Sequence, residues 1–391
     1  MRQLTYGGAR LPVLTPAVQA ELEPALREVI DYRKSGLSLN HVIGCPLDCA
    51  YCVRHFFGNY EMKKPRALIT DEEAVELLVN HQYFHPHVTP VQVFNRATDP
   101  MLPNVKPHTF RVLRGIDERR FTNHVLVITR WRVAEQDCLF FNSLRHIKLT
   151  LLVTHSGIND SRIEPVDSQI AAQSLMTAYA HAYRYRVVQY WRPIVPGLND
   201  SDHDIATART LAEHAHATVY TGLFYKSQVA EYYRSNGLPE PYAETATRKI
   251  FPETLEARIL AAFRRDDGTY GSLFRKTSCG VAYVHGTPDY NGHYGIQELC
   301  DICPLSQLDL CRNAFAKPDR RRVEQMAAEL GGKVAEVNDR AVVVTGIADS
   351  MRNMMQHRLG YQVHDANKPH LYRQHGRASI GWRNDTEPTG V

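Results

Sequence analysis

Seven of the chain's eight cysteines fall into two groups whose spacing suits metal binding. The first group is Cys45, Cys49 and Cys52 in the segment GCPLDCAYC, with three and then two residues between successive thiols. Such a loop can wrap three thiolates around a cube-shaped iron–sulfur cluster and leave the fourth iron without a protein ligand. A small molecule can bind at this open iron. The alternative is a structural zinc site in which His41 or His55 supplies the fourth ligand.

The second group lies within TSCG…ELCDICPLSQLDLC and consists of Cys279, Cys300, Cys303 and Cys311. Two of these cysteines form a knuckle with two residues between them, and the flanking pair completes four thiolates. No coordination position therefore needs to stay open. The group predicts a second [4Fe–4S] cluster, with zinc as the alternative because sulfur ligation alone does not distinguish the two.

The eighth cysteine, Cys138, stands alone in the apolar context DCLFF. We predict that it is either a residue of the core or a thiol that returns a hydrogen atom to a substrate. The stretch FRKTSCGVAYVHGTPDYNGHYG, which includes Asp289 and His293, is rich in polar and aromatic side chains. Its glycines allow close backbone approach to a ligand, so it is the candidate substrate-recognition segment, or else a loop that wraps the second cluster.

The elements that must position these residues alternate regularly. Predicted strands cover residues 37–43, 90–95, 124–129, 147–154, 187–194 and 218–225, and predicted helices cover 71–84, 108–119, 137–144, 168–184, 203–216 and 252–266. Six β–α units predict an α/β fold, a partial (β/α)6 TIM-like barrel, with chemistry at the carboxyl ends of its strands. A cysteine-rich C-terminal extension and a small α+β appendage follow.

The predicted domain organisation has four parts. Residues 1–36 form an N-terminal extension and 37–267 form the partial barrel. Residues 268–316, with weak periodicity, form the segment that binds the second cluster. Residues 317–391 form the small α+β domain, in which a basic helix leads into KVAEVNDRAVVVTG, a predicted β-hairpin.

Composition restricts the class of protein. The 391 residues carry a formal net charge of +4, with 43% hydrophobic and 23% charged residues, as in an ordinary soluble protein. This charge is too small for coating nucleic acid, although the tail KPHLYRQHGRASIGW mixes basic and aromatic residues that could bind it. The sequence has no secretion signal and no apolar run long enough for a membrane span, so we expect a cytoplasmic protein.

The first cysteine loop, with Tyr51 directly before the third cysteine, resembles the signature of the radical S-adenosylmethionine (SAM) superfamily. The segments VFNRATDPMLP, VLVITRW and PIVPGLND resemble motifs of its branch related to spore photoproduct lyase. The resemblance implies an enzyme that reductively cleaves SAM to a 5′-deoxyadenosyl radical and abstracts hydrogen from a nucleotide, a peptide or a specialised metabolite. It also implies a [4Fe–4S] cluster, SAM, and an electron donor such as flavodoxin or ferredoxin.

The resemblance further implies roles for individual residues. Those near the amino group of SAM are Asn95, Thr98 and Asp99. Those that hydrogen-bond its ribose or carboxylate are Thr129 and Ser156, and the guanidinium that pairs with its carboxylate is Arg192. The candidate catalytic residues are Tyr51, Lys226 at the end of the sixth strand, and Cys138.

The chain departs from the branch at three positions. Ala97 lies near the place where the lyase has a hydrogen-donating cysteine, Arg130 replaces a lysine, and Trp131 replaces a serine. Reversal of a DNA lesion by the lyase route is therefore in doubt. Two other classes remain open. One is a nucleic-acid-binding protein with two structural zinc sites, and the other is an iron–sulfur hydratase that uses no SAM.

Overall fold

The structure is a computed structural model that describes residues 10–246 and 249–368. The chain divides into two compact units, one of Met1–Tyr190 with Leu211–His216 and one of Trp191–Thr210 with Ala217–Val391. Its main sheet has eight strands in the order β1-β2-β5-β6-β7-β8-β9-β10. The pairs β2–β5, β5–β6, β6–β7 and β9–β10 are parallel, while β1–β2 is antiparallel. The predicted α/β class with a mainly parallel sheet is confirmed.

The strands of the first unit are short and apolar. They are β1 (Ile30–Arg33), β2 (Gly36–Leu39), β5 (Val91–Val93), β6 (His124–Thr129), β7 (Lys148–His155) and β8 (Arg186–Trp191, whose last residue belongs to the second unit). Nearly every residue of β2, β5, β6 and β7 is buried, as expected for a parallel sheet covered on both faces. Two further short strands, β3 (Val42–Ile43) and β4 (Arg66–Ala67), pair with each other outside the main sheet.

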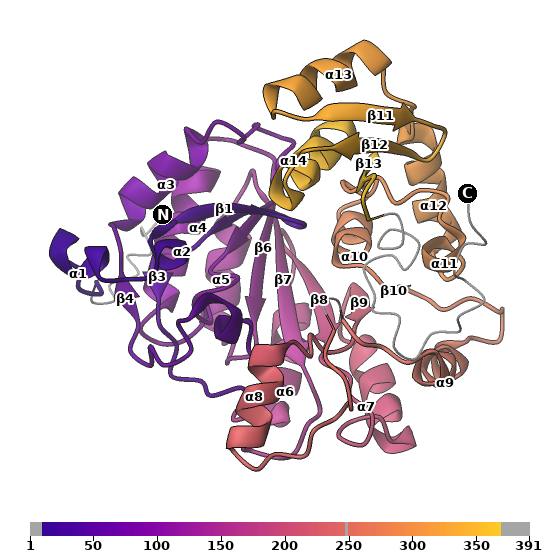
Figure 1. Cartoon of the computed structure of the whole chain (residues 1–391). Helices are drawn as coiled ribbons and strands as arrows, with labels where there is room; N and C mark the ends of the chain where they lie inside the picture. Colours follow the sequence, from indigo (N-terminus) through magenta and orange to yellow (C-terminus); the bar gives the residue numbers. More distant parts are fainter. Residues whose placement is uncertain (1–9, 247–248, 369–391) are drawn as a thin grey trace. The chain divides into compact units, whose positions relative to one another are not determined.

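Helices connect these strands (Figure 1). They are α3 (Asp71–Val79), α4 (Lys106–Asp117), α5 (Glu135–Ser143) and α6 (Ser168–Ala180). Helix α3 begins at a capping box, in which the Thr70 side chain accepts from Glu73 N–H and the Glu73 carboxylate accepts from Thr70 N–H. Two short N-terminal helices, α1 (Pro16–Ala20) and α2 (Pro24–Arg27), precede the sheet.

The second unit contains the remaining elements. Strands β9 (Ala217–Tyr220) and β10 (Leu273–Phe274) are accompanied by α7 (Asp202–Ala212, whose last two residues belong to the first unit), α8 (Ser227–Ser235), α9 (Glu253–Phe263), α10 (Thr277–Val284), α11 (Gln297–Cys300) and α12 (Leu305–Ala314). A separate sheet of β11 (Lys333–Val337), β12 (Ala341–Thr345) and β13 (Gln362–Asp365) follows, with α13 (Arg320–Glu329) and α14 (Asp349–Leu359). The predicted hairpin is confirmed as β11–β12.

Several predicted elements differ from the observed ones. The predicted strand 37–43 is broken after Leu39 and resumes at Val42. Strand β1 and helix α8 were not predicted, and the segment of weak periodicity contains α10, α11 and α12. The boundaries between the four predicted parts stay predictions, and residues 369–391, which hold most of the basic and aromatic tail, lie outside the described residues. Among the described helices, none has the length and hydropathy needed to cross a membrane.

Candidate metal and cofactor centres

The first cysteine loop follows β3 and is anchored by its own backbone. Cys45 N–H donates to Met62 O at 2.8 Å, and Cys52 N–H donates to Cys49 O at 3.0 Å. Gly44 has φ +92°, and a Cβ at this position would lie 2.4 Å from Lys64 O. Only glycine fits such a turn without moving backbone. The loop is therefore held in a fixed path through its three cysteines.

Arg54 organises the same loop from inside. This side chain is buried, on the 3-10 helix η1 (Val53–Phe57) that Cys52 caps. Its Nη2 donates to Leu47 O at 2.6 Å and its Nη1 donates to Tyr60 O at 2.9 Å. One guanidinium thus ties the cysteine loop at Leu47 to the segment after η1 at Tyr60 and satisfies carbonyls that burial would otherwise leave unpaired.

The spacing of the sulfurs tests which metal group fits. A zinc ion with sulfur ligands at about 2.3 Å holds the sulfurs about 3.8 Å apart. Within residues 10–246 and 249–368, each group of three or more potential ligand atoms lying within 4.8 Å of one another contains at most one cysteine. No three of the described sulfurs are therefore as close as one zinc ion requires. Thiolates that bind at separate iron corners of a cluster need no such close approach, so a cluster is compatible with this arrangement.

Burial also affects the thiols of the first group. Burial raises the pKa of Cys45 and raises that of Cys49 well above its ordinary value. Without a bound metal ion, both thiols therefore stay protonated and neutral at physiological pH. Metal coordination deprotonates a thiol outright. The first group can thus hold charged thiolates when a metal centre compensates them, which is also compatible with a cluster.

Tyr51 and Ser156, both predicted site residues, meet at a side chain that the sequence analysis missed. Glu164 Oε2 accepts hydrogen bonds from Tyr51 OH and, at 3.1 Å, from Ser156 Oγ. The same oxygen accepts from Arg130 Nη1 at 2.8 Å, and Glu164 Oε1 lies 3.9 Å from Cys49 Sγ. Glu164 stands in the polar segment NDSRIEP after β7, and no spacing in the sequence connects it to the cysteines.

Asp99 and Thr129 contact each other at the end of β6. Asp99 Oδ1 accepts from Thr129 Oγ1 at 2.6 Å and from Met101 N–H at 2.9 Å, while Oδ2 accepts from Arg130 N–H at 2.9 Å. Burial raises the pKa of Asp99. Thr129 Oγ1 also accepts from Trp131 N–H at 2.9 Å. The two side chains join the turn after β5 to the end of β6, so the structure gives them a structural role, and their predicted contacts with SAM stay predictions.

Asn95 and Thr98 are half-buried in the turn after β5. Thr98 Oγ1 is buried and has no hydrogen-bond partner in the described structure. It is therefore a polar group that a bound ligand could satisfy. Arg192 and Lys226 are half-buried in the second unit, where Lys226 caps α8 with its Nζ 5.9 Å from the centre of the Phe224 ring. Their predicted roles also stay predictions.

Cys138 is fully buried on α5. Burial raises the pKa of its thiol, although a hydrogen bond with Tyr185 acts in the opposite direction. Tyr185 is itself fully buried and donates to Ala178 O at 2.6 Å. This placement favours the first of the two interpretations of Cys138, a residue of the core, over a thiol that donates hydrogen to a substrate.

The second cysteine group lines a cavity in the second unit. Its lining includes Cys279, Cys300, Cys303, Cys311, Phe274, Arg275, Lys276, Asp289, His293, Tyr294, Leu299, Gln307 and Leu308. Burial raises the pKa of Cys279 well above its ordinary value and raises that of Cys303 to about 12. Cys311 Sγ accepts from Asp289 N–H at 3.4 Å and from Gln307 Nε2 at 3.3 Å. Donors aimed at sulfur suit a thiolate ligand.

Two residues of the candidate recognition segment belong to this cavity. Asp289 and His293 are both buried, and Asp289 Oδ2 lies 2.9 Å from His293 Nδ1. The same oxygen accepts from His293 N–H at 3.0 Å and from Asn291 N–H at 3.2 Å. A ligand atom of Cys279 lies within 4.8 Å of both side chains. This part of the segment therefore packs around the second cysteine group.

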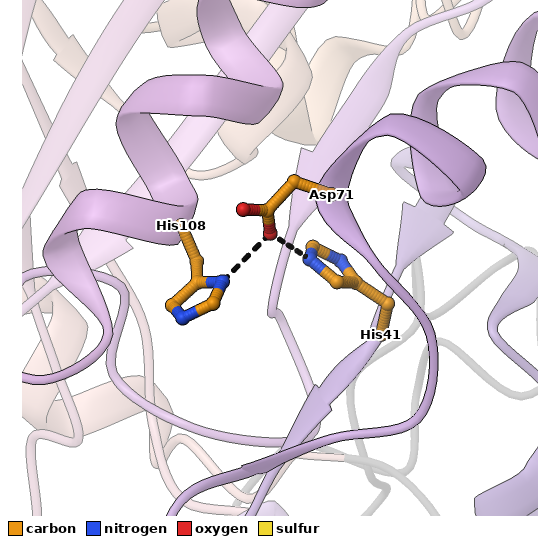
Figure 2. A group of neighbouring side chains, drawn as sticks. All are labelled: His41, Asp71 and His108. Atoms are coloured by element: carbon orange, nitrogen blue, oxygen red, sulfur yellow. Dashed lines mark hydrogen bonds and ion pairs between the residues drawn. The ribbon is translucent and has the colours of Figure 1, made fainter. Parts of the chain in front are cut away.

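A second close group of potential ligands lies in the first unit (Figure 2). Asp71 Oδ1 lies 2.7 Å from His41 Nε2 and 2.7 Å from His108 Nδ1, and Oδ2 accepts from Arg111 Nε. Leu11 N–H donates to His108 Nε2 at 3.0 Å, so in the neutral ring the proton is on Nδ1, which cannot then bind a metal. The group is a buried hydrogen-bonded anchor. His41, a candidate zinc ligand, is thus directed to Asp71.

Comparison with known proteins gives a structural likeness only. No protein-family model matches the chain, and no curated protein matches it. A spore photoproduct lyase variant with bound AdoMet and dinucleoside spore photoproduct is 10% identical over 68% of this chain and 86% of that chain, with a TM-score of 0.47. Streptococcus suis SuiB bound to S-adenosylmethionine is 8% identical over 66% of this chain and 54% of that chain, with a TM-score of 0.42. These values are too low to support a conclusion about chemistry.

Proposed function

We propose that this chain is a radical SAM enzyme whose catalytic [4Fe–4S] cluster is held by Cys45, Cys49 and Cys52. The observation that carries the proposal is the first cysteine loop. It presents three thiols on one fixed turn, more widely spaced than a single zinc ion allows. Three ligands leave one iron of a cubic cluster open, which is the position that SAM occupies in enzymes with this loop.

When loaded, the cluster would supply the electron that cleaves bound SAM to methionine and a 5′-deoxyadenosyl radical, and that radical would take hydrogen from an organic substrate. The chain's own residues hold and orient the reactants. Arg54 fixes the loop, and Glu164 fixes Tyr51 and Ser156 beside it. Thr98 Oγ1 offers an unused buried hydroxyl for a polar ligand.

The second cysteine group is proposed as an auxiliary [4Fe–4S] cluster. Its support is the same wide spacing of sulfurs, together with the N–H donors to Cys311 Sγ. Four thiolates would leave this cluster closed. Zinc sites with three or more sulfur ligands are disfavoured by that spacing, whereas Cys279, Asp289 and His293 lie close enough together to hold one metal ion, so the iron and zinc content decides the second site. An iron–sulfur hydratase remains distinguishable because it would not cleave SAM.

The test uses anaerobically reconstituted full-length protein. Iron and zinc are counted per chain, and 5′-deoxyadenosine is measured after reduction with dithionite in the presence of SAM. We expect about eight irons and deoxyadenosine release. Cys49→Ala should lose the release, whereas the matched variant Cys138→Ala should keep it. Release that persists in Cys49→Ala, or a wild-type protein that holds zinc without iron, would reject the proposed function.

A further inference from the structure

A buried ion pair lies directly against the first cysteine group. Arg130 Nη1 and Glu164 Oε2 are 2.8 Å apart, with side-chain exposures of 17% and 4%. Removing two charges from water costs several kcal/mol per ion, and their attraction offsets this cost only with good geometry and further hydrogen bonds. A buried pair is therefore weak evidence for added stability, so its location beside a metal ligand calls for another reason.

The pair places charges of both signs beside the loop. Glu164 Oε1 lies 3.9 Å from Cys49 Sγ. The Arg130 guanidinium carbon lies 5.2 Å from the centre of the Tyr51 ring, and Arg130 Nη1 donates to the Tyr51 hydroxyl. Because Tyr51 directly precedes Cys52, the guanidinium and the carboxylate both flank the position of the cluster. At such short range in a buried site, each charge acts strongly on its neighbours.

The remaining contacts hold this arrangement rigidly. Ser156 Oγ donates to Glu164 Oε2 at 3.1 Å, and Val166 N–H donates to Oε1 at 3.4 Å. Arg130 is fixed through its backbone, because its N–H donates to Asp99 Oδ2 at 2.9 Å. Both partners of the pair are thus fixed by contacts with the turn after β5 and with the segment that follows β7. Neither charge can move away from the loop without breaking hydrogen bonds.

We propose that Arg130 and Glu164 are positioning residues whose opposite charges balance beside the first cluster and so set its reduction potential. This inference rests on the proposed function, because it requires a cluster at Cys45, Cys49 and Cys52. Reduction adds negative charge to a cluster, so a nearby carboxylate disfavours the reduced state and a nearby guanidinium favours it. With both charges present, the reduction potential lies between the value expected with the carboxylate alone and the value expected with the guanidinium alone.

The test compares Glu164→Gln, Arg130→Gln and the double variant in the full-length, reconstituted protein. The midpoint potential of the first cluster is measured by redox titration followed by electron paramagnetic resonance. The signal that changes on addition of SAM identifies this cluster. We expect Glu164→Gln to raise the potential, Arg130→Gln to lower it, and the double variant to return close to the wild-type value. If the two residues had a purely structural role, the effects of the single variants would add in the double variant, and the midpoint potential would not return to the wild-type value.

A matched control is another buried carboxylate that is paired with a cation in the same unit. Asp137 is 2.9 Å from Lys106 Nζ, and this pair joins α5 to α4. Asp137→Asn should leave the potential unchanged. A shift in this variant equal to that of Glu164→Gln would mean that loss of any buried carboxylate acts on the cluster, which would overturn the inference.

Other outcomes separate the inference from the proposed function. Wild-type protein without a SAM-responsive iron signal contradicts the proposed function itself. If the wild type has this signal but both single variants shift in the same direction, or neither shifts, only the charge-balance inference fails. Loss of iron from both single variants, with circular dichroism spectra like the wild type, would also overturn it, because the pair would then serve assembly of the cluster.

Discussion

The two cysteine regions have the same ligand type but are built in different ways. The second is local in sequence, because every residue that lines its cavity lies between Phe274 and Cys311. The first takes its supporting contacts from distant segments, through Met62, Arg130 and Glu164. A region assembled from several strand ends depends on the whole first unit, whereas a local one depends mainly on its own loops and helices.

The regions also differ in their electrostatics. The first group lies beside an ion pair and a buried arginine. The second receives N–H donors at Cys311 and packs against Asp289 and His293. Charges near a cluster and hydrogen bonds to its sulfurs both change its reduction potential. The proposed function assigns an open cluster to the first region and a closed cluster to the second, a contrast that the following predictions test.

The largest expected effect is a separation of the two clusters by substitution. The double variant Cys300→Ala and Cys303→Ala should lower iron from about eight to about four per chain. Release of 5′-deoxyadenosine should persist, because the open iron belongs to the first group. Iron analysis and chromatography of the reaction products measure both quantities. Complete loss of release, with four irons retained, would show that the second group takes part in the SAM step.

The next effect concerns the buried anchor of the first unit. Asp71→Asn removes a carboxylate that holds His41, His108 and Arg111. Leaving Arg111 without its counter-charge and weakening the acceptor that the two histidines share should lower the apparent free energy of unfolding in urea by about 3–5 kcal/mol. Glu73→Gln, on an exposed residue of the same helix, should cost about 1 kcal/mol or less. Equal losses of unfolding free energy in the two variants would contradict the prediction that the Asp71 contacts stabilise the first unit.

A smaller effect is expected at the turn before Cys45. Gly44→Ala combines a positive φ with a Cβ 2.4 Å from Lys64 O, and should cost about 1–3 kcal/mol. We expect weaker iron binding at the first group and unchanged binding at the second. The control is Gly286→Ala, which also has a positive φ but no atom within 4 Å of the added Cβ. Similar iron loss in both would mean that strain alone, without the collision, accounts for the effect.

The smallest expected effect is a gradual loss of stability in mild acid. Burial lowers the pKa of His41 below its ordinary value of 6.5. The unfolded chain therefore binds this proton more readily, and stability declines as pH falls below about 6.5. Urea unfolding of the metal-free protein between pH 7.5 and 5 measures the slope, which His41→Gln should flatten. An unchanged slope in that variant would show that His41 does not carry the effect.

At lower pH the neighbouring carboxylate contributes in the same direction. Burial alone would raise the pKa of Asp71, but hydrogen bonds from His108, His41 and Arg111 hold it well below its ordinary value of 3.8. Its contribution to stability is therefore present above pH 3.8 and is lost as pH falls further. The second cysteine region has a comparable group, because burial alone would raise the pKa of Asp289 but the charge and hydrogen bond of His293 lower it to about 2, so strong acid should weaken both regions.

The sequence by itself determined the two cysteine groups, the alternation of strands and helices, and the terminal hairpin. These features depend on spacing and periodicity along the chain, which are local properties. The resemblance also drew attention to Thr98 and Asp99, but the sequence could not show that Asp99 accepts hydrogen bonds from Thr129 and Arg130.

Only the tertiary structure decided how the first cysteine loop is supported. Glu164 is distant from Cys49 in the sequence, and Asp71 is distant from both His41 and His108, so no local pattern connects them. The spacing of the sulfurs, which helps to distinguish a cluster from a zinc site, is also a property of the tertiary structure. The physical reason is that buried charges are stabilised by whichever segments the fold brings within hydrogen-bonding distance, and parallel strands bring together residues far apart in the chain.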